Sequence, residues 1–84
     1  MNIYVGNLDY EVSEEKLEEL FGGHGAVNSA KIIFDKFSGR SKGFGFIVMD
    51  DEMEAKEAIE HLNGTALNDR TIVVNEAKPK KRFT

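Results

Sequence analysis

The chain has 84 residues, of which 40% are hydrophobic and none is cysteine. A chain of this length can bury one modest core, so we expect a single domain. The lack of cysteine excludes disulfide bonds and thiolate metal sites, so packing must stabilise the fold. No run approaches the roughly 20 apolar residues that cross a bilayer, and the polar start leads straight into strand-like sequence. We therefore predict a cytoplasmic protein without membrane contact.

The formal net charge of −4 is unusual for a protein that binds polyanions. Residues 9–19 and residues 50–60 each hold six acidic residues and one basic residue, and both stretches have helical patterns. The rest of the chain holds three acidic and nine basic residues, a formal charge of +6. The acidic charge therefore belongs to the helices. There it either aids solubility or, as an alternative left open, provides a site for a protein partner.

The first predicted element is a strand over residues 3–8, in which Tyr4 alternates with apolar neighbours. A helix follows, with Ser13 as its N-cap and a stop at the glycines after residue 21. Residues 26–34 are strand-like, and alternation places Lys31 and Ile33 together on one face. A turn-rich loop then covers residues 35–41.

Residues 42–49 form the most informative segment, Lys-Gly-Phe-Gly-Phe-Ile-Val-Met. In a strand, this spacing puts Phe44 and Phe46 on one face together with Val48, while the small or aliphatic residues between them face a core. Flat rings displayed on an uncovered face suit stacked nucleobases. The segment therefore predicts a nucleic-acid platform shared with Tyr4.

A second helix is predicted from Asp51 to Leu62, with Asp51 and Glu54 as a capping box. The last strand is predicted over residues 71–76, after a turn at residues 68–69, and carries Val73 and Asn75 on the open face. The element order β-α-β-β-α-β indicates an α+β, ferredoxin-like sandwich. It has a four-stranded antiparallel sheet with two helices on one face and the other face open.

The two aromatic segments resemble the RNA-recognition motif (RRM) family, whose eight-residue motif is Lys/Arg-Gly-Phe/Tyr-Gly/Ala-Phe-Val-x-Phe/Tyr. Residues 42–49 agree at seven of the eight positions when Ile47 is counted for Val. Met49 replaces the usual aromatic residue on the inward side, so this departure concerns core packing. Residues 3–8 are similar to the family's six-residue motif. The chain looks like the small single-RRM proteins of bacteria, including cyanobacteria.

The resemblance implies that residues 1–77 form an RRM domain that binds single-stranded RNA, in post-transcriptional regulation or RNA handling. Tyr4 and Phe44 match the family positions that stack on consecutive bases, and Phe46 matches the position whose ring packs against sugars. Asn75 matches the stretch that reads base edges. Phosphate contacts are expected from the cations Lys31, Lys36, Arg40 and Lys42, and Ile33 is expected to add apolar surface on the open face. Phe37, in the same loop, either props the loop or stacks on the ligand.

Residues 78–84 contain four bases and a proline without core periodicity, so we expect a basic, flexible tail. In the family, the segment after the last strand often crosses the RNA. Phosphate contacts from Lys78, Lys80, Lys81 and Arg82 are therefore one prediction, and a solvated terminus is the alternative.

Three other functions stay open at this stage. A protein-interaction module could use the helical face, although the intact set of three rings argues against it. An enzyme of ferredoxin-like fold that hydrolyses acyl phosphates would need a glycine-rich anion loop with an arginine, and neither helix start supplies one. Single-stranded DNA could replace RNA, because only contacts to the 2′-hydroxyl separate the two polymers. We predict no catalysis, no cofactor and no metal at His24 or His61, and a monomer.

Overall fold

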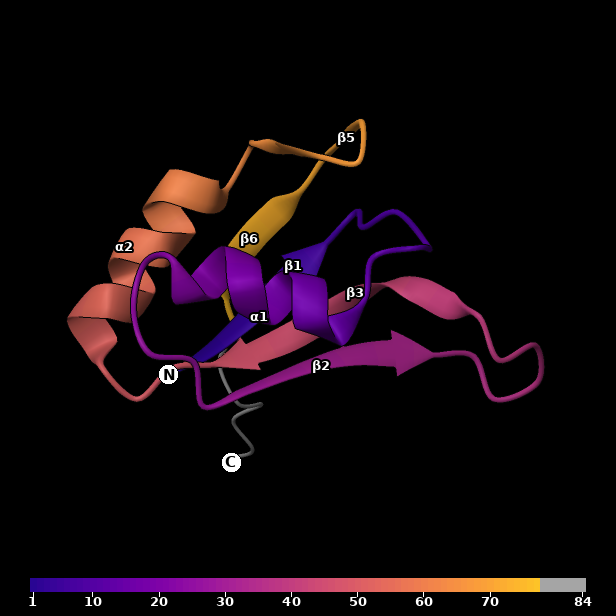
Figure 1. Ribbon diagram of the computed structural model, residues 1–84, viewed down its shortest axis with the longest axis horizontal. Helices are drawn as coiled ribbons and strands as arrows, with labels where there is room; N and C mark the ends of the chain where they lie inside the picture. Colours follow the sequence, from indigo (N-terminus) through magenta and orange to yellow (C-terminus); the bar gives the residue numbers. More distant parts are fainter. Residues whose placement is uncertain (78–84) are drawn as a thin grey trace, which may run out of the picture.

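A computed structural model describes residues 1–77 of the protein. The elements follow one another in this order (Figure 1): β1 (Asn2–Gly6), α1 (Glu14–Gly22), β2 (Ser29–Phe34), β3 (Ser41–Val48), α2 (Glu52–Leu62), β4 (Ala66–Leu67), β5 (Arg70–Thr71) and β6 (Val73–Glu76). Four of the strands form an antiparallel sheet in the order β2-β3-β1-β6. The predicted ferredoxin-like α+β fold is confirmed.

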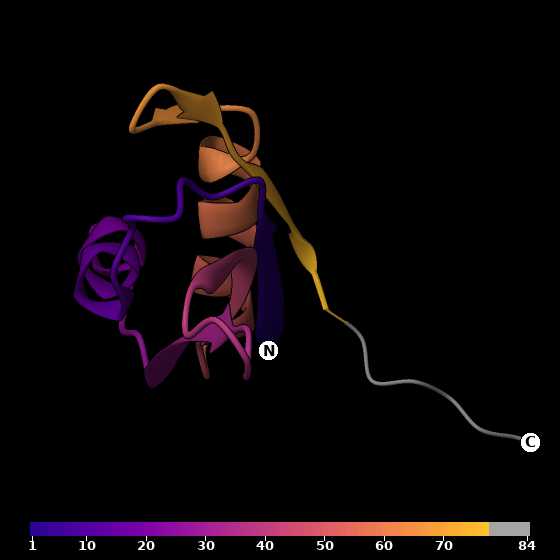
Figure 2. The ribbon, with the colours of Figure 1, turned by 90° about the vertical axis from the view of Figure 1, so that its right-hand side faces the viewer.

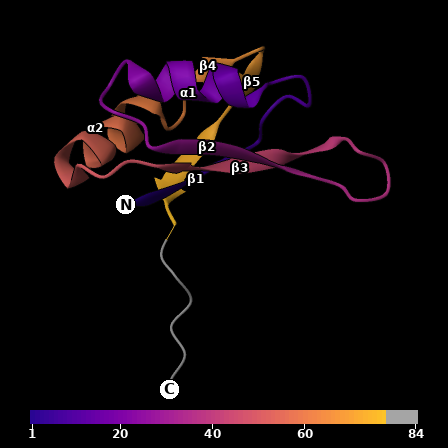
Figure 3. The same ribbon diagram turned by 60° about the horizontal axis from the view of Figure 1, so that its bottom comes forward.

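Both helices cover the same side of the sheet. Figure 2 shows α1 and α2 on one side of β1 and β6, and Figure 3 shows α1 above β2 and β3. Alternation along the strands sends every second side chain into the layer between helices and sheet. The core there includes Ile3, Val5, Leu17, Phe21, Ile47, Met49 and Val74, each fully buried. Met49 thus fills the core in place of the family's aromatic residue. Among residues 1–77, no helix covers the other face of the sheet.

The helices begin at the predicted caps. The Ser13 hydroxyl accepts a hydrogen bond from the Lys16 amide at 3.1 Å, and the Asp51 carboxylate accepts one from the Glu54 amide at 3.0 Å. The second half of the predicted capping box is wrong, because the Glu54 carboxylate turns to another partner, the Ala26 amide, at 3.1 Å. Glu54 therefore links the start of α2 to the segment that precedes β2.

The strand predicted over residues 26–34 begins three residues later, at Ser29. Side chains explain the difference. The Asn28 carboxamide donates to the Asp50 carboxylate at 3.0 Å and accepts from the Asp50 amide at 2.8 Å. Since Glu54 also binds the Ala26 amide, residues 26–28 are held by polar side chains of a neighbouring segment. The apolar pattern alone carries no sign of these bonds.

The segment before the last strand contains a hairpin that the sequence reading missed. Strands β4 and β5 pair over two residues each, and the turn between them has positive φ at Asn68 (51°) and Asp69 (66°). Two positive φ values in a two-residue loop match the right-handed twist of a hairpin, and Asn and Asp tolerate them. The predicted strand over residues 71–76 is accordingly divided between β5 and β6.

Within residues 1–77, neither helix is long and apolar enough to span a bilayer.

Candidate nucleic-acid interface

A row of four side chains crosses the open face of the sheet from edge to edge. Register pairs Lys31 on β2 with Phe46 on β3, Phe46 with Tyr4 on β1, and Tyr4 with Asn75 on β6. Paired residues point to the same side of an antiparallel sheet, so a cation, two rings and an amide lie side by side. The neighbouring row, which includes Val5 and Val74, points into the core.

Phe44 completes a triangle of rings with Tyr4 and Phe46. The ring centroids lie 6.0 Å apart for Tyr4 and Phe44, 5.9 Å for Tyr4 and Phe46, and 6.1 Å for Phe44 and Phe46. The planes of Tyr4 and Phe44 are tilted by 32°, whereas Phe46 meets Phe44 edge-on at 89°. All three rings are half-buried. The rings therefore hold one another in place and still present surface to a ligand.

Gly6 allows the Tyr4 ring to lie down along β1. A Cβ atom at Gly6 would overlap the Tyr4 hydroxyl and come within 2.8 Å of two ring carbons. Because glycine has no such atom, the phenol rests against the backbone of its own strand, where Tyr4 stays half-buried. The position of Gly6 in the six-residue motif is thus explained by the space that the Tyr4 ring needs.

The remaining predicted face residues surround this triangle. Ile33 and Val48 are half-buried, and Val73 is exposed at 42%. Ile33 lies where the β2–β3 register shifts, between Ile32 and Phe34. Lys42 is exposed at the start of β3, two residues before Phe44. The face is thus apolar at its centre and carries cations toward the β2–β3 side.

The loop between β2 and β3 ends in an ordered turn. The Asp35 carboxylate accepts hydrogen bonds from the amides of Phe37 at 2.7 Å and Ser38 at 3.1 Å, and the Asp35 amide donates to the Arg40 carbonyl at 2.7 Å. The bonds from Ser38 and Phe37, with a smaller contribution from the charge of Lys42, lower the pKa of Asp35. Arg40 and Lys36 are both exposed around this turn. Lys78, Lys80, Lys81 and Arg82 lie outside the described residues.

The sequence reading missed a polar group at the end of β1. Asn7 has a positive φ of 57°, and its carboxamide donates to the Thr71 carbonyl at 2.6 Å and accepts from the Arg70 guanidinium at 3.4 Å. The β4–β5 hairpin thereby brings a cation to the rim of the sheet. A turn at residues 68–69 was predicted. Recognising this turn as the two-residue loop of a hairpin would have placed Arg70 at the start of the second strand of that hairpin.

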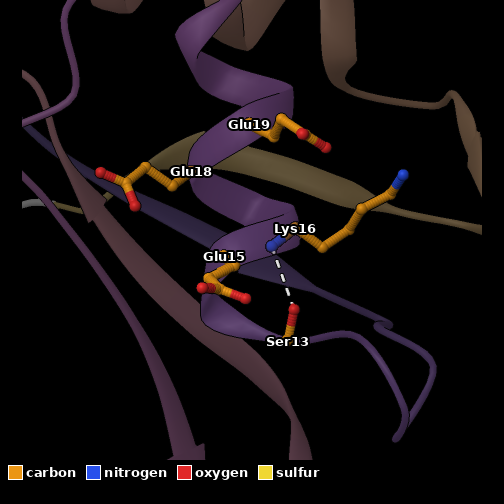
Figure 4. A pocket seen from close by; sticks show the side chains of 5 residues that line it. All are labelled: Ser13, Glu15, Lys16, Glu18 and Glu19. Atoms are coloured by element: carbon orange, nitrogen blue, oxygen red, sulfur yellow. Dashed lines mark hydrogen bonds between the residues drawn. The ribbon is translucent and has the colours of Figure 1, made fainter.

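A shallow hollow lies on the outer side of α1, away from the sheet (Figure 4). Three glutamates and one lysine line it, together with the N-cap: Glu15, Glu18, Glu19, Lys16 and Ser13. Its carboxylates would repel phosphate, so the acidic helical layer and the ring-bearing face differ in the ligands that they can accept.

The two histidines, which belong to different elements, meet near the ends of the helices. Their rings stack with centroids 5.4 Å apart and planes inclined by 29°. Among residues 1–77, no group of three or more His, Cys, Asp or Glu side chains is arranged to hold a metal ion. The stacked rings form a packing contact between His24 and His61.

Comparison with known proteins places this geometry in a family. The RNA recognition motif profile matches residues 3–73, so the chain belongs to the RNA recognition motif family. The chain is 49% identical over 80 residues to the chloroplast 28 kDa ribonucleoprotein of Nicotiana sylvestris, covering 95% of this chain and 29% of that protein.

Two solved structures agree with the fold in detail. The crystal structure of RNA binding protein PG1 has a TM-score of 0.91 at 49% identity, with 98% of this chain and 99% of that chain covered. The Rna15 RRM with bound RNA (GU) has a TM-score of 0.83 at 32% identity, over 93% of this chain and 83% of that chain. The expectation of an RNA-binding domain is thus confirmed at the level of the family.

Two expectations need correction. The chain spans less than a third of the Nicotiana relative, and that protein is chloroplastic, which contradicts the predicted cytoplasmic location. The likeness to bacterial proteins also finds no support among these relatives, since they come from plants. Composition and the start of the chain hold no information that separates these compartments.

Proposed function

We propose that the open face of the sheet binds single-stranded RNA by stacking bases on Tyr4 and Phe44, with Phe46 packed against the sugar between them. The observation that carries the proposal is the triangle of half-buried rings, each about 6 Å from the other two. A ring held by its neighbours loses little side-chain freedom on binding, which favours stacking. Stacking on such platforms is worth about 1–3 kcal/mol per base.

Polar groups around the rings complete the proposed site. Lys31 pairs in register with Phe46, and Lys42 opens the same strand, so both can meet phosphates beside the stacked bases. Arg40 lies further along the loop, and Asn75 beside Tyr4 can donate to or accept from a base edge. Ile33 supplies apolar surface. The basic tail is proposed to add phosphate contacts through Lys78, Lys80 and Arg82.

The proposed activity is binding by a monomer in RNA handling, with residues 1–77 as the binding domain and residues 78–84 as its tail. Two or three stacking platforms imply an affinity on the order of micromolar. Single-stranded DNA is the second candidate, favoured by the apolar centre of the face, because stacking on rings does not require a 2′-hydroxyl. A protein partner on the acidic helices would be a separate activity.

The test is an NMR titration of isotope-labelled protein with a pool of short randomised single-stranded RNAs, repeated with the matching DNA pool. With RNAs this short, we expect shifts at residues 2–8, 31–34, 40–48 and 73–82, and none on α1 or α2. A Tyr4→Ala/Phe44→Ala variant should lose these shifts while keeping the dispersed spectrum of a folded protein. Each replaced ring should weaken binding about fivefold or more.

Glu18→Ala is the matched control, since this exposed side chain lies on the opposite layer. It should leave the shifts unchanged. Shifts on the helices in place of the sheet would contradict the proposal and favour the acidic layer as the binding surface. Equal affinity for the DNA pool would show that the site does not use the 2′-hydroxyl.

A further inference from the structure

Phe37 is the most exposed large apolar side chain among residues 1–77, with 98% of its surface open to solvent. It lies in the turn that joins β2 to β3, which projects beyond the helices in Figures 1 and 3. A ring with this exposure has no packing partner among the described residues. Of the two roles considered from the sequence, the prop for the loop is therefore wrong.

The backbone that carries Phe37 is nevertheless ordered. The Asp35 carboxylate accepts from the Phe37 and Ser38 amides, the Gly39 amide donates to the Asp35 carbonyl at 2.8 Å, and the Asp35 amide donates to the Arg40 carbonyl. Four hydrogen bonds thus close a turn of six residues. A ligand that stacks on the ring would meet a pre-formed backbone, so less conformational entropy is lost on binding.

The charges beside Phe37 indicate the chemistry of its ligand. Lys36 precedes the ring and Arg40 follows it, and both are exposed. An aromatic face between two cations suits a nucleobase with its phosphates, and it suits neither a basic peptide nor an apolar helix. The turn continues β3 at Ser41, which lies three residues, or about 10 Å, from Phe44 at the usual strand rise of about 3.3 Å per residue. Phe37 lies beyond that end of the strand.

We propose that Phe37 is an additional base-stacking platform, which binds the part of a single-stranded RNA that runs off the sheet past Phe44. This inference rests on the proposed function of the sheet. It predicts a footprint with two parts: a short segment on the sheet rings, and a further base on the β2–β3 turn that only a longer strand can reach.

The experiment compares affinities for randomised single-stranded RNA pools of about four and about twelve nucleotides. Phe37→Ala should bind the longer pool about fivefold more weakly or worse and the shorter pool unchanged. Phe37→Leu keeps an apolar side chain without a flat ring and should behave like Phe37→Ala. Met53→Ala is the matched control, because Met53 is 79% exposed on α2, and it should bind both pools like the parent protein.

A second readout comes from Phe37→Trp. The chain contains no tryptophan, so the emission of this variant reports on the turn alone. We expect full affinity for both pools and quenching by the longer pool only.

Unchanged binding of the longer pool by Phe37→Ala, or no quenching in Phe37→Trp, would overturn this inference and leave the sheet site standing. Self-association lost in Phe37→Ala, with RNA affinity intact, would assign the ring to a second copy of the chain and also overturn it. Failure of the parent protein to bind either pool would overturn both proposals.

Discussion

At the scale of single residues, the open face depends on side chains that are absent as well as on rings that are present. Gly45 separates Phe44 from Phe46 and points toward the core side, where the backbone of β2 passes close by. A Cβ atom there would overlap the Lys31 carbonyl oxygen and lie 3.1 Å from the Ile32 Cα. Backbone atoms cannot move aside as a flexible side chain can, so the two strands would have to separate.

The family motif accepts alanine at this position, but in this chain the β2 backbone lies too close for a Cβ atom. Gly45→Ala should therefore destabilise the protein by about 1–3 kcal/mol, the usual cost of overpacking. It should also weaken RNA binding, since the shift of β3 moves both flanking rings. Urea denaturation gives the first quantity and RNA titration the second. Gly22→Ala is the control, because nothing lies within 4 Å of a Cβ at that helical position. Alanine there should leave the free energy of unfolding unchanged or raise it by up to about 1 kcal/mol. Equal midpoints for both variants would contradict the steric argument.

At the scale of elements, long amphipathic patterns were predictable and short polar links were not. The pattern of residues 42–49 predicted β3, its buried face and the open face that carries the rings, because strict alternation indicates a strand with one face buried. The helix starts followed from Ser13 and Asp51. The β4–β5 hairpin escaped detection because strands of two residues show no alternation. The loss of the strand at residues 26–28 depends on contacts from Glu54 and Asp50, which are distant in sequence.

The β2–β3 turn leads to a prediction about pH. The bonds from the Ser38 and Phe37 amides require the Asp35 carboxylate, so its pKa is lowered. The Asp35 carboxylate therefore stabilises the turn fully above the ordinary aspartate pKa of about 3.9. This stabilisation is lost as the pH falls through the lowered pKa of Asp35 in the folded protein. In an NMR titration with acid, the Phe37 and Ser38 amides should move together, with a midpoint below about 3.9.

The Lys16 amide is the internal control for this titration, because its acceptor is the Ser13 hydroxyl, which does not titrate with acid. It should not follow the same curve. In Asp35→Asn the acid-dependent movement of the two loop amides should disappear. A midpoint at or above the ordinary value would show that the carboxylate does not make these bonds in solution.

At the scale of the whole molecule, the chain separates its charges into two layers. The acidic helices lie on one side of the sheet, and the rings with Lys31 and Lys42 lie on the other. The shortest dimension of the molecule is 21 Å, whereas charges are screened over about 8 Å at physiological salt. A protein of net charge −4 can therefore bind a polyanion, because bound RNA is largely shielded from the acidic layer.

This reasoning predicts a salt-dependent effect of the helical acids. Glu18→Gln/Glu57→Gln, two exposed positions on α1 and α2, should change RNA affinity less than about twofold at 0.15 M salt. The same variant should bind more tightly than the parent protein at about 0.01 M, where the screening length grows to about 30 Å. Lys31→Ala should instead weaken binding at both salt concentrations and reduce the salt slope by about 1, as expected for a lost phosphate contact. Tighter binding by the glutamine variant at 0.15 M would mean that RNA passes close to the helices, and the sheet would then be only part of its path.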